Sequence, residues 1–319
     1  MNILITGITG SGGSYLAEYI LKNHLDVNVW GICRWHSTST LANIEGIKDK
    51  ITVKECDLLD ISSIIRTLQV CKPDRIFHLA AYANVKKCFE TPLAVVNNNI
   101  IGTANLLEAV RLVCPKCLVQ LCSTSEVYGN PQTIPITEQH PVAPVNPYAV
   151  SKLAGEALGY AYFSTWKMNI IITRAFAYIN PRRKDLFASA FAYQVVEIEN
   201  GEKNILSHGN LDSIRTLIDV RDAMRAYWVA CDYCQPGEAY NIGGHEPITI
   251  GTFLHKLKEH AKVSIISKLD KSLLRPVDIT MQIPDTTKFD TLTKWKPKYS
   301  LDASIEFLLK TYRKVVQNG

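Results

Sequence analysis

Three residues in the middle of the chain have the types and spacing of a proton-transfer site. Tyr148 and Lys152 stand four positions apart at the start of a helix-like stretch, and Thr124 ends a run of strand-forming residues. Because residues four apart share a helix face, we expect the Lys152 cation beside the Tyr148 phenol, where it would lower the phenol's pKa. A phenol that ionises near neutral pH is a competent base for a sugar hydroxyl, and Thr124 can hydrogen-bond the same hydroxyl.

Taken alone, a Tyr and a Lys at this spacing are equally typical of an amphipathic helix with one surface lysine. Two neighbouring features favour the reactive interpretation: the segment Ser123-Thr124-Ser125-Glu126 directly after a strand, and a glycine loop near the start of the chain. Side chains at the carboxyl ends of parallel strands reach the ligand crevice of an α/β sheet. We therefore predict that Thr124, Tyr148 and Lys152 are catalytic.

The glycine loop has the pattern G-x-x-G-x-x-G, formed by Gly7, Gly10 and Gly13. It follows a predicted strand, Asn2–Thr6, and precedes a helical stretch. Glycines let the chain turn tightly and bring backbone N–H groups to a pyrophosphate at the helix N-terminus. An ordinary tight turn is the alternative, which the strand–loop–helix context disfavours. We predict a dinucleotide site that includes Thr9.

The end of the second predicted strand indicates which nicotinamide cofactor binds. The chain has Cys33-Arg34-Trp35-His36-Ser37 where an NAD site usually has an acidic residue. Arg34 can pair with the 2′-phosphate of NADP, and Ser37 or Ser39 can hydrogen-bond to it. A solvated Arg at a strand end is the alternative. We predict NADP.

Further cofactor contacts follow from the ends of the next two strands. Asp57, with Leu58 beside it, follows the third strand and is placed to accept from the adenine amino group. The fourth strand ends in Leu79, Ala80 and Ala81, whose small side chains let backbone lie close to the cofactor.

Strand and helix patterns alternate through the first half of the chain. The predicted strands lie at Asn2–Thr6, 27–34, 51–57, 75–81, 118–123 and 169–174. This alternation predicts an α/β fold with a Rossmann-type doubly wound parallel sheet. After Pro181 the pattern becomes mixed, which indicates a smaller mixed α/β lobe that binds substrate. We expect a cofactor domain of residues 1–180 plus 216–245 and a lobe of 181–215 plus 246–319.

Composition excludes several other classes of protein. The net charge of +5 is spread along the chain without a basic cluster, so we expect no nucleic-acid binding. No apolar run reaches membrane-span length and no signal peptide is visible, so we expect no membrane association and a cytoplasmic location. The nine cysteines are typical of reduced thiols. Cys114/Cys117 and Cys231/Cys234 have CxxC spacing, which leaves a shared zinc site as an alternative to loop cysteines; we predict no metal.

At these motifs the chain resembles the extended short-chain dehydrogenases/reductases that modify nucleotide sugars, and among them the GDP-mannose 4,6-dehydratases. The resemblance covers nearly the whole chain. The matching segments are GITGSGGSYLAEYIL (7–21), CDLLD (56–60), HLAAYANVKKCFETP (78–92), STSEVYG (123–129), NPYAVSK (146–152) and NPRR (180–183).

The resemblance implies an NADP-dependent hydro-lyase that converts GDP-mannose to GDP-4-keto-6-deoxymannose. C4 would be oxidised with Tyr148 as base, water would be lost across C5 and C6, and hydride would return to C6. Glu126 matches the glutamate that removes the C5 proton, although an exposed strand-end carboxylate remains the alternative. The implied substrate contacts are Ser123, Ser125, Arg215 and Arg275; Asn99, Arg182 and Arg183 are further candidates.

A second resemblance leaves the reaction open. The segments at 209–228, 273–276 and 294–297 are similar to GDP-4-keto-6-deoxymannose reductases. Epimerases on the same scaffold and a non-catalytic cofactor-binding protein are further alternatives. Ala177 stands where the family has a substrate-contacting Asn, which leaves the sugar open and admits another GDP-sugar such as a heptose. Homodimers or homotetramers are implied by the family.

Overall fold

A seven-stranded parallel sheet forms the body of the protein. We describe a computed structural model, which covers residues 1–34, 41–274 and 278–317. The strands follow the order β11-β6-β5-β4-β1-β2-β3. Their bounds are β1 Asn2–Thr6, β2 Asn28–Cys33, β3 Thr52–Glu55, β4 Arg75–His78, β5 Leu118–Thr124, β6 Ile170–Ala175 and β11 Ala239–Ile242. The predicted Rossmann-type fold is confirmed.

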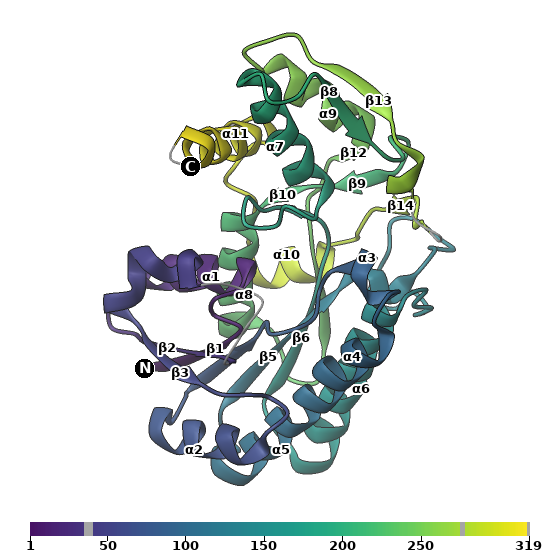
Figure 1. Cartoon of the computed structure of the whole chain (residues 1–319). Helices are drawn as coiled ribbons and strands as arrows, with labels where there is room; N and C mark the ends of the chain where they lie inside the picture. The colour runs from purple at the N-terminus through teal and green to yellow at the C-terminus, as the bar shows by residue number, and fades with distance from the viewer. Residues whose placement is uncertain (35–40, 275–277, 318–319) are drawn as a thin grey trace.

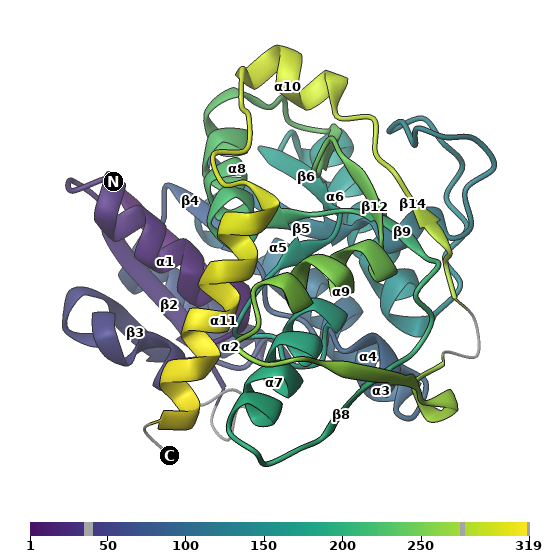
Figure 2. The same ribbon diagram turned by 90° about the horizontal axis from the view of Figure 1, so that it is seen from above.

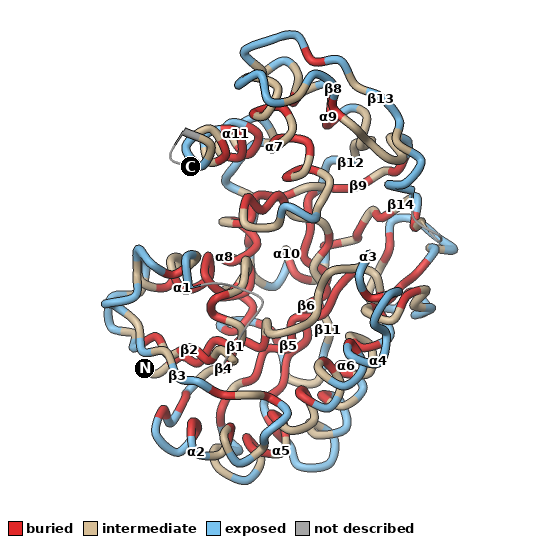
Figure 3. The backbone as a smooth tube through the Cα atoms, viewed as in Figure 1, coloured by how far each residue is buried: buried red, intermediate tan, exposed pale blue. Residues whose placement is uncertain are grey.

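Helices cover both faces of this sheet (Figure 1). Ile3 and Ile5 pack on one face and Leu4 on the other, since side chains alternate along a strand. Helices α1 and α8 cover the first face, and α2, α5 and α6 the second. The central strands β1, β4, β5 and β6 are mostly buried on both sides, as the red tube in Figure 3 shows, whereas the edge strand β3 is largely exposed. The helix bounds are α1 Ser11–Asn23, α2 Ile61–Cys71, α5 Gly102–Val113, α6 Pro147–Trp166 and α8 Val220–Tyr233.

Short helical segments complete the sheet body. Their bounds are the 3₁₀ helices η1 Leu41–Lys50 and η3 Ser125–Tyr128, the π-helical turn η2 Asn97–Ile101, and α3 Val85–Cys88, α4 Pro92–Val96 and α10 Thr287–Thr293. Helix α10 packs against α8 and β11, and its Phe289 lies in the core of the sheet body.

A smaller lobe with its own hydrophobic core stands above the sheet in Figure 1. Its elements are β7 Tyr178–Ile179, α7 Phe187–Glu199, β8 Ile205–His208, β9 Ile214–Thr216, β10 Ile218–Asp219, β12 Pro247–Thr249, α9 Ile250–Glu259, β13 Ile266–Leu269, η4 Lys271–Leu273, β14 Met281–Gln282 and α11 Leu301–Gln317. Helix α11 crosses the lobe beside α7 (Figure 2) and also reaches α1, where Phe307 meets the edge of Tyr15. The predicted domain boundaries remain a proposal, and the packing of α10 favours assigning it to the sheet body.

The two CxxC pairs lie on opposite faces of the sheet. Cys114 and Cys117 belong to the core under α2 and α5, whereas Cys231 and Cys234 belong to the core under α1 and α8. The pairs therefore do not share one zinc ion. Within the described residues, no group of three or more His, Cys, Asp or Glu side chains is arranged to hold a metal, and no helix is long and apolar enough to span a membrane.

Candidate active site

The glycine loop lies at the carboxyl end of β1 and has no room for side chains. Gly7 has a φ of +69°, and a Cβ there would lie 2.9 Å from the Cα of Ala80. A Cβ on Gly13 would lie 2.4 Å from the carbonyl oxygen of Gly7. Gly10 caps α1 without a side chain, and Thr9 is buried beside it. The N-terminus of α1 is thus a backbone cradle suited to a pyrophosphate.

Arg34 follows β2 and reaches the loop after β4. Its guanidinium donates to the Tyr82 hydroxyl at 3.2 Å and stacks over that ring at 5.2 Å. Ser37 lies outside the described residues, so its predicted contact has no structural counterpart here. Arg34 thus lies at the carboxyl end of β2, and its contact with a 2′-phosphate remains a prediction.

The remaining predicted cofactor residues lie along the same edge. Asp57 is half-buried and accepts from the Leu59 amide at 2.9 Å, while Leu58 is buried. Leu79, Ala80 and Ala81 directly follow β4 and are half-buried. One Asp57 oxygen thus accepts a hydrogen bond within its own turn, and the adenine contact remains a prediction.

Thr124 and Tyr148 meet where β5 ends and α6 begins. The two side chains are hydrogen-bonded. Pro147 occupies the first turn of α6, and Asn146 caps that helix by accepting from the Ala149 amide at 2.8 Å. The cap holds Tyr148 in the first helical turn, facing the strand end.

Asn146 also holds Glu126. Its amide nitrogen donates to a Glu126 carboxylate oxygen at 2.6 Å. Glu126 lies in η3, is half-buried, and acts electrostatically on Tyr148. The structure thus brings together Thr124, Glu126 and Tyr148, and adds Asn146, whose role the motif NPY alone did not reveal.

The expected lowering of the Tyr148 pKa is wrong. Burial raises the pKa of Tyr148, and the Arg183 guanidinium opposes this more strongly than the hydrogen bond from Thr124 does. Arg183 forms two hydrogen bonds to Asp185, at 2.7 and 2.8 Å, and one to the Ala83 carbonyl. The cation that acts on the phenol is therefore Arg183, which comes from the segment after β7.

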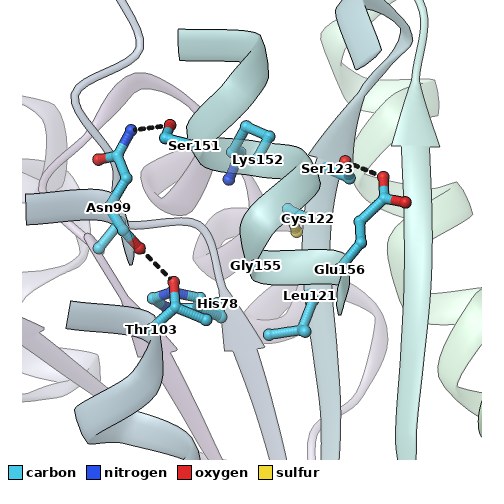
Figure 4. A pocket seen from close by; sticks show the side chains of 11 residues that line it. His78, Asn99, Thr103, Leu121, Cys122, Ser123, Ser151, Lys152, Gly155 and Glu156 are labelled. Atoms are coloured by element: carbon cyan, nitrogen blue, oxygen red, sulfur yellow. Dashed lines mark hydrogen bonds between the residues drawn. The ribbon is translucent and has the colours of Figure 1, made fainter. Parts of the chain in front are cut away.

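Lys152 lines a small cavity between α6 and β5 (Figure 4). The cavity measures about 10 Å³, which is room for roughly one water molecule. Burial lowers the pKa of Lys152, while Cys122 and Glu156 act in the opposite direction. Lys152 belongs to α6, the same helix as Tyr148, and its neighbour Ser151 donates to the Tyr148 carbonyl at 2.7 Å.

Ser123, predicted to contact substrate, points into the protein instead. Its hydroxyl donates to Glu156, one helical turn beyond Lys152 (Figure 4). Glu156 is bound by Arg174 of β6 at 2.7 Å, with both side chains almost fully buried. Arg174 also donates to the Tyr128 hydroxyl at 2.9 Å. No local sequence pattern predicts this ion pair, because Glu156 and Arg174 are eighteen residues apart.

A second buried chain of hydrogen bonds was also missed. Thr6 contacts His78 Nδ1 at 2.8 Å, and His78 Nε2 contacts Thr103 at 2.9 Å. Thr103 donates to the Asn99 carbonyl and Thr6 accepts from the Ala80 amide, which makes Nε2 the protonated nitrogen of His78. Burial lowers the pKa of His78 to about 3. The neutral ring therefore fixes the end of β4 to that of β1.

Asn99 connects this chain to the catalytic helix. Its side chain accepts from the Tyr82 amide at 2.8 Å and donates to Ser151 at 2.9 Å (Figure 4).

Arg182, a further candidate for a substrate contact, binds α1 through Ser14 at 2.8 Å and Glu18 at 2.5 Å.

The predicted substrate residues are dispersed. Arg215, on β9, is buried and donates to the carbonyls of Ile214 and Ile279 at 2.8 and 2.6 Å. Ser125 is buried in η3, and Arg275 lies outside the described residues. Ala177 separates β6 from β7, and its carbonyl accepts from Ile218. A diphosphate contact from Arg215 remains a prediction.

Comparison with known proteins places this arrangement in a family. The family model described as GDP-mannose 4,6 dehydratase matches residues 4–307. A GDP-mannose 4,6-dehydratase of Yersinia enterocolitica is 32% identical over 96% of this chain and 85% of its own length. A GDP-6-deoxy-D-mannose reductase of Pseudomonas aeruginosa is 27% identical over 99% and 98%, respectively.

A solved structure of an epimerase has a similar fold. The UDP-glucuronic acid 4-epimerase of Bacillus cereus, in complex with UDP-glucuronic acid and NAD, has a TM-score of 0.86 at 27% identity. The alignment covers 99% of this chain and all of that one. With the family model spanning nearly its whole length, the chain belongs to the GDP-mannose 4,6-dehydratase family.

Proposed function

We propose that the protein is a GDP-mannose 4,6-dehydratase that uses NADP. The observation that carries this proposal is the placement of two bases of different kinds at one strand end. The Tyr148 phenol is hydrogen-bonded to Thr124. The Glu126 carboxylate, which accepts from Asn146 at 2.6 Å, is close enough that its charge raises the pKa of the same phenol. A phenol and a carboxylate together can remove protons from a hydroxyl and from a neighbouring carbon.

In this proposal Tyr148, Thr124 and Glu126 each have a separate role in the reaction. Tyr148 takes the proton of the C4 hydroxyl, which Thr124 orients, as C4 loses hydride. The resulting ketone acidifies the C5 proton, which Glu126 removes, and water leaves from C6. After hydride returns to C6, the C5 proton is restored, so the net change is loss of one water. Arg183 favours this sequence because its charge stabilises the phenolate form of Tyr148.

The residues at the β1, β2 and β4 ends fit a nicotinamide dinucleotide. The glycine cradle suits its pyrophosphate, and Arg34 suits a 2′-phosphate. When bound, this cofactor supplies the acceptor and donor of the hydride. The B. cereus epimerase contains NAD; the choice of NADP for this chain rests on Arg34.

Arg34→Ala tests the cofactor assignment. Loss of the only charge proposed for the 2′-phosphate should weaken NADP binding by about tenfold or more and leave NAD binding nearly unchanged. Titration calorimetry with both cofactors measures the ratio. An unaltered NADP/NAD preference contradicts the assignment.

Incubation with GDP-mannose tests the reaction. With NADP present and no reduced cofactor added, the product should be lighter than the substrate by one water, as mass spectrometry reports. Glu126→Gln should lower the overall rate by about 10²–10⁴-fold while oxidation at C4 persists, seen as cofactor absorbance at 340 nm. Full activity of this variant would exclude Glu126 as the C5 base; Glu45→Gln, on the exposed part of η1, is the matched control.

Reduction of a 4-keto-6-deoxy sugar is the second candidate. It is favoured by the match to the P. aeruginosa reductase, which spans 98% of that protein. Turnover of the keto sugar with NADPH, together with no product from GDP-mannose, would decide for it. Ala177 has no side-chain amide to contact the sugar, whereas the family has an Asn at this position. Other GDP-sugars such as GDP-heptose are therefore the next substrates to assay.

We further propose a cytoplasmic location and a homodimeric or homotetrameric assembly. None of the nine cysteines, all within the described residues, is in a disulfide, as is typical of a reducing compartment. Light scattering coupled to gel filtration measures the assembly directly.

A further inference from the structure

A pair of thiols lies at the amino end of β5, at the opposite end of this strand from the proposed catalytic residues. Cys114 follows the last residue of α5, and Cys117 directly precedes β5. The Cys117 amide donates to the Cys114 carbonyl at 2.9 Å, which closes a four-residue turn with Pro115 as its second residue. Such turns bring their outer Cα atoms within about 7 Å, and disulfides span about 4.4–6.8 Å.

The two thiols also interact with each other, and the Cys117 sulfur donates to the Leu118 carbonyl at 3.6 Å. A hydrogen bond between the two thiols lowers the pKa of Cys114 and raises that of Cys117. Cys114 is half-buried, whereas Cys117 is only 4% exposed. Cys114 is therefore the accessible sulfur with thiolate character, and Cys117 is a protonated thiol held next to it.

A third thiol, Cys71, lies at the end of α2 in the same core. Burial, and next the charge of Cys114, raises its pKa to about 12. Asp74 adds negative charge that acts on both Cys71 and Cys117. These groups leave Cys114 as the member of the cluster that can attack an oxidant.

We propose that Cys114 and Cys117 form a redox-active dithiol that hydrogen peroxide converts to a disulfide. The Cys114 thiolate attacks one peroxide oxygen, the O–O bond breaks, hydroxide leaves, and Cys114 becomes a sulfenic acid. The Cys117 sulfur then attacks the Cys114 sulfur, and the sulfenic oxygen leaves as water with the Cys117 proton. In total two thiols lose two electrons and two protons, and one peroxide becomes two waters.

The other CxxC pair provides a control with the same spacing in the same chain. Cys231 and Cys234 lie at the end of α8, are 8% and 9% exposed, and the Cys231 thiol donates to Gln120 at 3.5 Å. Burial raises the pKa of both. Because neither is an accessible thiolate, we expect this pair to react much more slowly.

Peptide mapping after peroxide treatment tests the proposal. The reduced full-length protein is treated with a few equivalents of hydrogen peroxide, alkylated and digested with trypsin without reduction. Cleavage after Lys116 separates the two cysteines, so a disulfide joins peptide 112–116 to peptide 117–152 at two hydrogens below their summed mass. Since Cys122 is in the second peptide, Cys117→Ser must abolish the link; its persistence would overturn the assignment.

Two further measurements complete the test. Cys117→Ser should trap the first step, so that dimedone labels Cys114; absence of the adduct contradicts the proposed nucleophile. The wild type should form the Cys114–Cys117 link at least tenfold faster than any Cys231–Cys234 link. Equal rates, or a disulfide to Cys71, would overturn the proposal. Circular dichroism melting confirms that each Ser variant is folded, and none of these measurements depends on the proposed dehydratase reaction.

Discussion

At the scale of single residues, Tyr148 faces two opposing demands. As a base it must lose a proton, yet burial raises its pKa. The nearby groups that favour the phenolate are Arg183 and the Thr124 hydroxyl. Arg183 is itself oriented by Asp185 and by the Ala83 carbonyl, so its charge is held in place before substrate arrives.

Arg183→Met should therefore raise the Tyr148 pKa further. Since the base acts when deprotonated, the rise of kcat/KM with pH should move to higher pH by about one unit, which lowers kcat/KM near pH 7.5 roughly tenfold. The pH profile measures this shift. Arg183→Lys keeps the charge and serves as control; an unmoved profile in the Met variant would show that Arg183 does not tune the phenol.

Sequence reasoning found residues with local patterns and missed those whose partners are distant. Tyr148 belongs to a motif five residues long, and Thr124 caps η3, the short helix that carries Glu126. The resemblance implies a substrate contact for Ser123, but a position at a strand end does not reveal which way the hydroxyl points. That direction is set by Glu156, 33 residues away.

At the scale of elements, His78 joins β4 to β1 and α5 through one neutral ring. Its pKa of about 3 in the folded protein lies far below the ordinary 6.5. Between these values the unfolded chain binds a proton that the folded chain does not, so the stability contribution is present above about pH 6.5 and lost as pH falls toward 3.

His78→Gln, which cannot titrate, should flatten this dependence. We expect the free energy of unfolding of the wild type to fall more between pH 7.5 and pH 5 than that of the variant. Urea unfolding at the two pH values measures both. If the free energy of unfolding fell equally in both proteins, His78 would not be the source of this pH dependence.

The Glu156–Arg174 ion pair joins α6 to β6, and through Tyr128 and Asn241 it also reaches β11. Glu156→Gln leaves the buried Arg174 charge uncompensated and should cost about 3–5 kcal/mol of folding free energy. The double variant Glu156→Met/Arg174→Met removes both charges and should recover most of that loss. Urea denaturation compares them; a Gln variant as stable as the wild type would contradict the account.

At the scale of the whole molecule, the alternation of strands and helices predicted the sheet correctly. Hydrophobic periodicity and the residues at strand ends are enough to predict the sheet, because each βαβ unit is formed by residues that are close in the sequence. The lobe was less predictable, since β8 and β13, or β9 and β14, pair across roughly sixty residues. Helix α10 shows the same difficulty: it follows lobe segments in the chain yet packs on the sheet body.

The double use of Asn146 limits which amino acids that position can accept. Its oxygen caps α6 and its nitrogen holds Glu126. Asp caps helices equally well but would set a second negative charge against Glu126, and Gly supplies neither contact. Ser and Thr are one bond shorter and have a single oxygen for both partners. In a library of all twenty residues at 146, Asn should thus be the one variant that keeps both the helix start and the carboxylate in place.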